Sequence, residues 1–455
     1  MKKYKHPGSF RDPNSGVYMM KDNVERLFSP EGKEEFLHCE ASGLFTELVD
    51  RNLLLKYEKS INEQANLEIR SPIIPFVSYR SEWCFEQLRA AALLTLEIEL
   101  TALKYECSLK DASSYNVQFQ GVYPVFIDHG SFEPYKEGLP WVAYNQFCEH
   151  FLSPLLILAR QDFAPNEISG TTTSGIKIDV ASKLLPRLSI NAFAHIHLQN
   201  HYLKKYSTPI SLSKKLETKF ISLKSRISLV QSLYDCVESL KLKSNTTEWG
   251  GYYDFGGNNY VEVGHKSKSH IITDFIKKTK AKKVLDLGAN DGKFSRAIAL
   301  HCDYVVSTDY DRSAINSNYI QSIKNREANI QVGFLDVMNP TPAIGWANQE
   351  RQSFIQRADF DLVMALALVH HLVVTEGVPI PKICEFFHSL TKKFLIIEVP
   401  DVNDSQVQIL NRWGGRNKDL YSPEKFEYHF GLQFKILEKR LVSDSERKIY
   451  LLEKL

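Results

Sequence analysis

Short apolar runs alternating with helical stretches fill the second half of the chain. The apolar runs are 284–287, 304–308, 330–335, 360–366 and 394–398. Helices are expected between them at 293–301, 313–324 and 383–390. This alternation predicts a parallel sheet that binds its ligands at the carboxyl ends of the strands. Two further runs, 434–440 and 448–452, predict an antiparallel hairpin that closes the sheet.

The first of these strands breaks into a turn that contains Gly288 and Gly292. The Gly-x-Gly-x-x-Gly spacing of a dinucleotide site is absent. Instead, Asp286 precedes the first glycine, and a carboxylate there suits a positively charged ligand such as S-adenosylmethionine (SAM). Asp309 ends the second strand, where doubly wound folds hold a ribose diol. Asp336 ends the third strand and is placed to accept a hydrogen bond from an adenine amino group.

With these acids, residues 282–398 resemble a class I SAM-dependent methyltransferase domain. The resemblance implies an α/β fold, with a Rossmann-like sheet of seven strands and helices on both faces. It also implies a set of SAM-binding residues: Asp286, Gly288, Asn290, Gly292, Asp309, Asp336 and Val337. Asn290 replaces the middle glycine of many members, and asparagine tolerates a positive φ. The alternative is another Rossmann-like domain whose acids serve solubility.

Candidate catalytic residues follow the fourth and fifth strands. In the resembled fold, the end of the fourth strand lies beside the transferable methyl group. His370 or His371 is a candidate general base there, because imidazole titrates near neutrality. The alternative is that one of them caps a helix or makes a structural hydrogen bond. Glu398 is a candidate for orienting the acceptor, or else it stabilises a loop. The Asn/Asp-Pro-Pro-aromatic segment of DNA amine methyltransferases is absent, so DNA is not expected as a substrate.

The amino-terminal part carries a second set of candidate residues. A long apolar helix, 82–105, is followed by Asp111, Asn116 and, beyond a predicted hairpin, Asp128. Transfer of phosphate from ATP needs a carboxylate to orient the acceptor hydroxyl, and an amide and a carboxylate for magnesium. This spacing resembles the catalytic core of protein-kinase-like and aminoglycoside-phosphotransferase-like folds. The resemblance implies an α+β domain with Asp111 as base, Asn116 and Asp128 as metal ligands, and ATP with magnesium as ligand.

The amino-terminal part also departs from those folds. Leu109 stands where such loops usually carry histidine, and residues 1–75 contain no glycine-rich nucleotide loop. Arg26 is the nearest candidate for the phosphate-contacting base. We therefore expect a degenerate kinase-like domain that binds nucleotide, a substrate or a partner. An active phosphotransferase is the alternative.

These features predict three parts: a kinase-like domain at 1–205, a basic helical linker at 206–245 and a methyltransferase domain at 246–455. An aromatic segment, 245–253, is expected to cap the cofactor site or to pack on the sheet edge. The whole arrangement resembles bacterial two-part methyltransferases of the nodulation-protein type. The matching segments are 108–132, 140–151, 247–253 and 282 to the end.

Composition narrows the function further. The chain has 56 basic and 54 acidic residues, so no global field favours nucleic acid or a membrane surface. No apolar run approaches the roughly 18 residues of a membrane span, and the first residues lack a secretory signal. Seven dispersed cysteines without a Cys-x-x-Cys pair indicate reduced thiols, a cytoplasmic location and no metal site. The expected function is methylation of a hydroxyl, amine or carboxyl on a small molecule or glycan. The alternative is a regulatory or interaction protein.

Overall fold

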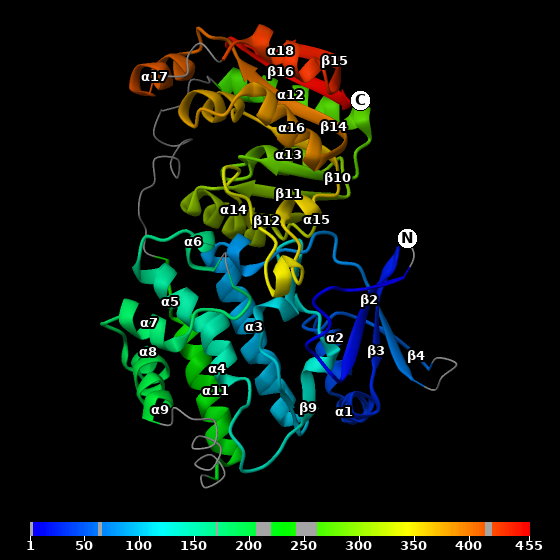
Figure 1. The fold of residues 1–455 in the computed structure, drawn as a ribbon, viewed down its shortest axis with the longest axis vertical. Coiled ribbons are helices and arrows are strands. Elements are labelled where there is room, and N and C mark those ends of the chain that lie inside the picture. Colours follow the sequence, from blue (N-terminus) through cyan, green and yellow to red (C-terminus); the bar gives the residue numbers. More distant parts are fainter. Residues whose placement is uncertain (1–2, 62–65, 170–171, 206–219, 243–261, 415–420) are drawn as a thin grey trace. The chain divides into compact units, whose positions relative to one another are not determined.

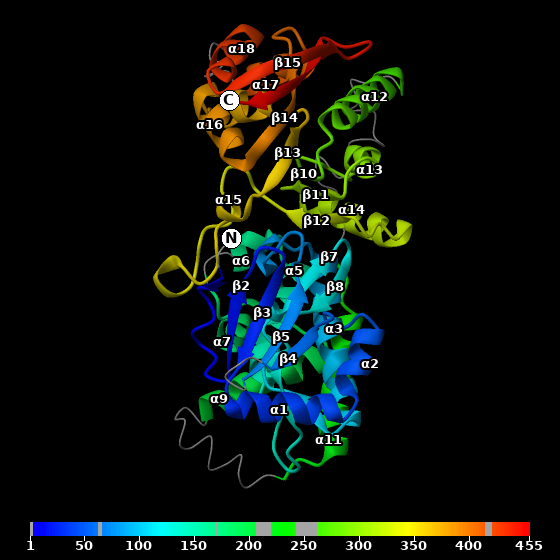
Figure 2. The same cartoon turned by 90° about the vertical axis from the view of Figure 1, so that its right-hand side faces the viewer.

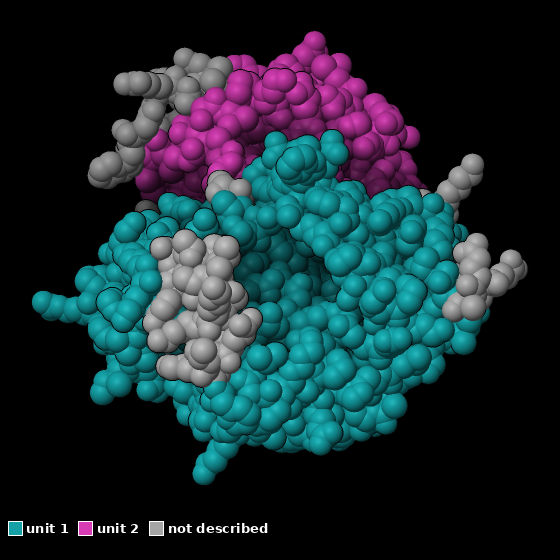
Figure 3. Space-filling view, turned by 60° about the horizontal axis from the view of Figure 1, so that its bottom comes forward, with its two compact units in different colours: residues 1–243, 341–353 teal, residues 244–340, 354–455 magenta. Residues whose placement is uncertain are grey.

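The computed structural model describes residues 3–61, 66–169, 172–205, 220–242, 262–414 and 421–455, drawn from two sides in Figure 1 and Figure 2. They form two compact units, coloured separately in Figure 3. Unit 1 contains residues 1–243 and 341–353, and unit 2 contains residues 244–340 and 354–455. The aromatic segment 245–253 lies outside the described residues.

Unit 1 begins with a five-stranded antiparallel sheet in the order β1-β2-β3-β5-β4. Its strands are β1 (Tyr4–Lys5), β2 (Ser15–Met19), β3 (Asn23–Phe28), β4 (Glu58–Ile61) and β5 (Leu67–Pro72). Two helices, α1 (Pro30–Ala41) and α2 (Leu44–Asp50), are inserted between β3 and β4. Figure 2 shows α1 across one end of this sheet.

The rest of unit 1 is mainly helical and is built around α3 (Phe85–Lys104). The predicted hairpin is β7 (Val117–Gln120) with β8 (Tyr123–Phe126), and β6 (Cys107–Leu109) pairs with β9 (Phe132–Pro134). The remaining helices are α4 (Tyr144–Phe147), α5 (Ser153–Arg160), α6 (Pro165–Ser169), α7 (Ile178–Leu184), α8 (Ile190–Phe193), α9 (Gln199–Lys205) and α11 (Leu223–Glu238). Both sheet and helices are present, in agreement with the expected α+β content.

The helix expected inside a linker belongs to unit 1. It is α11, and it packs along α3. Arg226 of α11 forms a buried ion pair with Glu99 of α3 at 3.4 Å, and Glu99 also accepts a hydrogen bond from the Leu109 amide at 2.7 Å. A buried cation of this kind needs its partner, so α11 is fixed to α3. The helical part of the expected linker is therefore assigned to unit 1, whose first stretch ends at residue 243.

Unit 2 contains the seven-stranded sheet that the sequence predicts, in the order β12-β11-β10-β13-β14-β16-β15. The strands are β10 (Lys283–Leu287), β11 (Tyr304–Asp309), β12 (Ile330–Phe334), β13 (Phe360–Ala365), β14 (Thr391–Pro400), β15 (Phe434–Leu441) and β16 (Arg447–Lys454). The first five strands are parallel, and β16 pairs antiparallel with both β14 and β15. The strand order reverses at β10, which is where such sheets bind ligands.

Helices cover both faces of this sheet. Figure 2 shows α12 (Glu262–Thr279), α13 (Lys293–Ala299) and α14 (Arg312–Asn325) on one face. On the other face lie α16 (Ile380–Leu390) and α18 (Pro423–Gly431). Two further helices are α15 (Phe354–Arg357) and α17 (Ser405–Gly414). The core lies between the layers, where the apolar residues of β10, β13 and β14 are buried. Among the helices of the described ranges, none is long and apolar enough for a membrane span.

Candidate active site

The turn after β10 has a backbone that only particular residues tolerate. Gly288, Asn290 and Gly292 have φ values of 74°, 52° and 80°. A Cβ atom on Gly292 would lie 2.2 Å from the Asn318 side-chain oxygen of α14, so no larger residue fits there. Around Gly288 the nearest atom to such a Cβ lies at 3.9 Å. The turn therefore passes close to α14 at Gly292 and leaves space at Gly288.

Asp286 lies buried at the carboxyl end of β10. Its Oδ2 accepts a hydrogen bond from Ser295 Oγ of α13 at 2.6 Å. Its Oδ1 has no hydrogen-bond partner within the described part of the chain. Burial raises the pKa of this carboxyl to about 7. One oxygen of Asp286 is thus available to a ligand, and a cationic ligand would favour the ionised carboxylate.

Asp309 joins the tip of β11 to the turn after β10. Its Oδ2 accepts from the Asn290 amide at 2.7 Å, and its Oδ1 accepts from the Asp311 amide at 2.8 Å. Burial raises its pKa to about 6, and the backbone amides act in the opposite direction. The Asp309 carbonyl accepts from the Leu335 amide at 2.9 Å, which places the end of β12 beside it. Three of the predicted strand tips therefore meet.

Asp336 and Val337, the predicted adenine-side residues, lie just after β12, beyond Leu335, and are half-buried. Oδ1 of Asp336 accepts a hydrogen bond from the Met338 amide at 2.9 Å. This bond fixes the carboxylate at the end of its strand. Each carboxylate oxygen has two lone pairs, so Asp336 retains capacity to accept from a ligand.

His370 and His371 follow β13 with ring centroids 4.3 Å apart, and His371 begins a π-helical turn. The side chain of His370 makes no capping hydrogen bond to this turn. Its Nδ1 is buried without a hydrogen-bond partner among the residues described. Burial lowers the pKa of His370 well below its usual value and that of His371 to about 4. Both rings are therefore neutral at pH 7.

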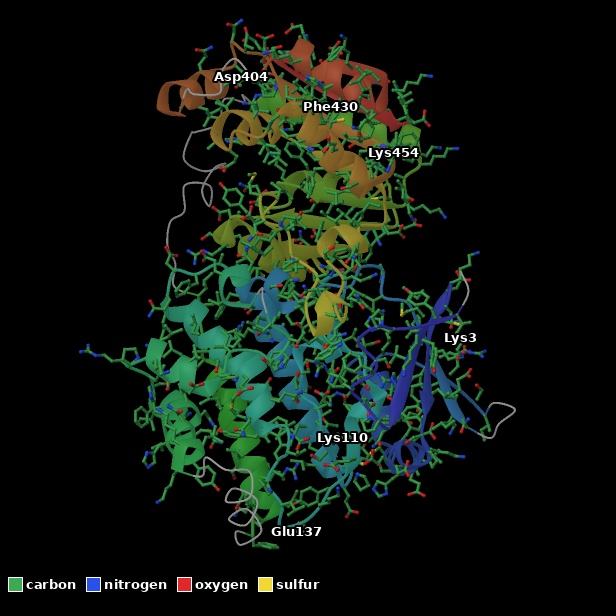
Figure 4. The ribbon with its side chains drawn as sticks, viewed as in Figure 1. Lys3, Lys110, Glu137, Asp404, Phe430 and Lys454 are labelled. Atoms are coloured by element: carbon green, nitrogen blue, oxygen red, sulfur yellow. The ribbon has the colours of Figure 1, made fainter. Side chains whose placement is uncertain are left out.

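Glu398, near the end of β14, lies in a buried charge cluster that we define as Lys268, Glu398, Asp404 and Arg447. Oε1 of Glu398 accepts from Arg447 Nη1 at 3.2 Å, and Oε2 is paired with Lys268 Nζ. Arg447 also binds both oxygens of Asp404 at 2.7 and 3.0 Å, and Figure 4 shows Asp404 beside α17. Both oxygens of Glu398 are thus held by cations of the protein.

Sequence reasoning missed Lys268, Asp404 and Arg447. The feature of the sequence that could have identified Arg447 is a charged residue at a position that the alternation of a strand assigns to its buried face. Arg447 alternates with Ile449 and Leu451 along β16, and these three side chains are buried. A cation at such a position requires a buried acid as partner, and the partner is distant in sequence.

In unit 1 the structure brings the kinase-like candidates together. Asn116 Nδ2 lies 3.4 Å from the Asp111 carbonyl oxygen, and the pKa of Asp111 is raised by burial and, to a lesser extent, by the nearby carboxylate of Asp128. Arg26 of β3 pairs with Asp128 at 2.9 Å. Its other terminal nitrogen donates to Ser15 Oγ at 2.6 Å. Residues far apart in the sequence therefore form one polar cluster beside the hairpin β7–β8.

Three comparisons place the chain among known proteins. No family model matches it. The nodulation protein NoeA of Rhizobium meliloti (strain 1021) is 30% identical over 463 residues, which cover 98% of this chain and 95% of that protein. Among solved structures, the magnesium protoporphyrin IX methyltransferase ChlM of Synechocystis PCC 6803 with bound SAH is 14% identical. It matches 46% of this chain and 98% of its own, with a TM-score of 0.33.

The N-methyltransferase NodS of Bradyrhizobium japonicum WM9 is 12% identical and covers 42% of this chain and 97% of its own, with a TM-score of 0.32. The strand order of unit 2 and its glycine turn give this unit the class I methyltransferase fold. The resemblance of the whole chain to a nodulation-type protein is confirmed by its full-length relative. The chain belongs to the family of the nodulation protein NoeA.

Proposed function

We propose that this protein transfers a methyl group from SAM to a hydroxyl, amine or carboxyl of a small molecule or glycan. One observation carries the proposal. Asp286, Asp309 and Asp336 lie at the ends of adjacent parallel strands where the strand order reverses, and one buried oxygen of Asp286 has no partner among the described residues. This arrangement suits a ligand with a cationic end and a polar nucleoside end.

Each group has a role in holding SAM, which supplies a methyl group on a sulfonium. Asp286 binds the ammonium group through its available oxygen, and the turn from Gly288 to Gly292 accommodates the methionine part. Asp309 accepts from the ribose hydroxyls while its backbone hydrogen bonds keep it in place. Asp336 and Val337 flank the adenine.

The acceptor side is formed by His370 and the charge cluster. His370 is neutral, and its Nδ1 is not used within the described structure, so it is the candidate that receives the acceptor's proton. A low pKa makes His370 a weak base. It can still take the proton once bond formation to the methyl group has made the acceptor more acidic. Glu398 is a positioning residue, because Lys268 and Arg447 occupy both of its oxygens.

Calorimetric titration of the purified chain with SAM, and separately with S-adenosylhomocysteine, tests the cofactor directly. Both are expected to bind in a one-to-one ratio. Binding of neither ligand to a folded chain would overturn the proposal and would favour a regulatory or interaction protein. Transfer of labelled methyl groups from SAM to pooled small molecules and glycans then distinguishes binding from catalysis.

SAM affinity is expected to rise with pH between about 5.5 and 7.5, below the usual pKa of an α-amino group. The pKa of Asp286 is about 7 in the free chain, so at lower pH the carboxyl is mostly protonated. A bound ammonium favours the ionised form, so binding releases this proton and strengthens as pH rises. Dissociation constants measured across this range check the slope.

The control for this slope is Asp286→Asn, which keeps the size of the side chain but does not ionise. Its pH profile should be flatter than that of the wild type. Asp309, with a pKa of about 6, accounts for the slope that remains. Identical profiles for the two proteins would remove Asp286 from the ammonium site.

We propose further that unit 1 is a kinase-like binding domain without phosphotransfer. The contacts among Asp111, Asn116, Asp128 and Arg26 support a kinase-like arrangement. Arg26, however, forms an ion pair with Asp128, the carboxylate that magnesium would need. In addition, residues 1–75 contain no glycine-rich nucleotide loop. Phosphoryl transfer depends on positioning and charge neutralisation, so most of the rate should be absent.

Release of labelled phosphate from ATP, or its transfer to the chain itself, checks this expectation. Wild type and Asp111→Ala should give the same background. Turnover in the wild type that disappears in Asp111→Ala would show an active kinase.

A further inference from the structure

Two arginines of unit 1 converge on the ring of Tyr115. The guanidinium carbon of Arg351 lies 4.3 Å from the ring centroid, and that of Arg80 lies 6.0 Å from it. Arg80 precedes α3, Tyr115 follows Asp111 by four positions, and Arg351 belongs to the segment 341–353 of the same unit. Two cations thus share one aromatic side chain beside the loop that carries Asp111.

Neither guanidinium pairs with a carboxylate in the described part of the chain. Arg80 is 2% exposed and uses its terminal nitrogens on neutral acceptors, His150 Nδ1 at 3.1 Å and the Thr172 carbonyl at 3.0 Å. The Nε atoms of Arg80 and Arg351 are both buried without a hydrogen-bond partner among the described residues. Arg80 is buried and Arg351 is half-buried. Buried cations are normally paired with an anion, and here only Glu350, which already binds Arg11, lies close enough to Arg351 for their charges to interact.

The nearest acids are engaged elsewhere. Glu350 binds Arg11 through both of its oxygens. Glu82 accepts from the Tyr79 amide at 3.0 Å, which caps the turn that carries Arg80. Both acids lie close enough to influence Tyr115. Glu350 also lies close enough to Arg351 for their charges to interact, but within the described structure no salt bridge joins it to Arg351 or Arg80.

Neutral polar groups complete the surroundings. His150 Nδ1 lies 3.1 Å from Ser114 Oγ and accepts from the Ser114 amide at 3.3 Å. Burial, together with Arg80 and Arg351, keeps the pKa of His150 well below its usual value. His6 behaves in the same way, with a pKa of about 4 from burial and from Arg351. Uncharged histidines leave the positive charge on the two arginines.

We propose that Arg80, Arg351 and the Ser114–Tyr115 turn form a binding site for a phosphoryl group. Each guanidinium keeps an Nε–H donor without a partner among the described residues, and a dianion offsets both charges, whereas a single carboxylate offsets only one. The site lies on the loop of Asp111, so it holds the phosphoryl group of a ligand bound to unit 1. It is independent of SAM binding in unit 2.

Competition titrations of the full chain test this site. Inorganic phosphate is the primary probe, and ATP with magnesium and glucose 6-phosphate are the competitors. Saturable binding of phosphate to the wild type is expected. Competition by ATP identifies a nucleotide as the source of the group, and competition by the sugar phosphate identifies a phosphorylated metabolite or glycan.

The decisive variant is Arg351→Gln, which should weaken phosphate binding at least about tenfold. Arg351→Lys keeps the positive charge but loses the planar guanidinium, so its phosphate affinity should lie between those of the wild type and Arg351→Gln. Arg89→Gln is the matched control, because Arg89 pairs with Glu86 at 2.6 Å and should leave phosphate affinity unchanged. Thermal unfolding confirms that each variant is folded. Absence of saturable phosphate binding to the wild type, or equal affinity in wild type and Arg351→Gln, would overturn the proposal.

Discussion

Asp309→Ala is expected to weaken SAM binding about 30- to 150-fold, equivalent to roughly 2–3 kcal/mol. The carboxylate lies at the tip of β11 and accepts from the amides of Asn290 and Asp311. Alanine removes an acceptor for two ribose hydroxyls and also releases the turn after β10 that the carboxylate holds. Calorimetric titration of wild type and variant with SAM measures the loss.

Asp303→Ala is the control for Asp309, because Asp303 is an exposed acid just before the opposite end of the same strand. It removes the same charge from unit 2 and should leave SAM affinity unchanged. Far-ultraviolet circular dichroism verifies that both variants are folded. Wild-type affinity in a folded Asp309→Ala protein would refute the assignment of the cofactor site.

Arg447→Met is expected to lower the free energy of unfolding by about 3–5 kcal/mol. Arg447 is 2% exposed and binds Asp404 with two hydrogen bonds and Glu398 with one. Methionine fills much of the volume but leaves Asp404 buried without its partner and Glu398 with Lys268 alone. Denaturant unfolding at neutral pH, followed by circular dichroism, gives the difference.

Arg440→Met is the matched control. Arg440 lies in the adjacent strand and also bridges two acids, Asp274 at 2.9 Å and Glu438 at 2.7 Å, but its side chain is 30% exposed. Exposed ion pairs contribute at most about 1 kcal/mol, so this variant should lose much less stability. Equal losses in the two variants would mean that burial of the charge cluster is not what makes Arg447 important.

Much of unit 2 could be predicted because each local signal in its sequence agrees with the fold. The run 284–287 became β10, and the closing hairpin became β15 and β16. The helix α12 begins at Glu262, well before the apolar residues Ile271 and Phe275 that mark it in the sequence, because polar residues such as Ser267 obscure the helical pattern. Boundaries of this kind depend on packing that local sequence does not contain.

The candidate site was predictable where its members lie at the ends of strands. Asp286 and Asp309 could be found because a parallel sheet brings such positions together. The charge cluster could not be predicted, because Lys268 comes from a helix more than a hundred residues before Glu398. Arg447 reaches Glu398 only through the antiparallel pairing of β16 with β14. The Arg80–Arg351 pair escaped prediction for the same reason, since Arg351 follows β12 in sequence but belongs to unit 1.

The assignment of residues 341–353 to unit 1 governs how this protein can be cut into fragments. The backbone passes from unit 1 to unit 2 at residue 243, returns at 340 and leaves again at 353. A gene truncated to begin after residue 243 would therefore carry a stretch whose partners, such as Arg11 for Glu350, have been removed. For unit 2 to fold by itself, residues 341–353 must be removed and residues 340 and 354 joined by a short loop. A proteolytic cut near residue 243 alone would not release two complete units.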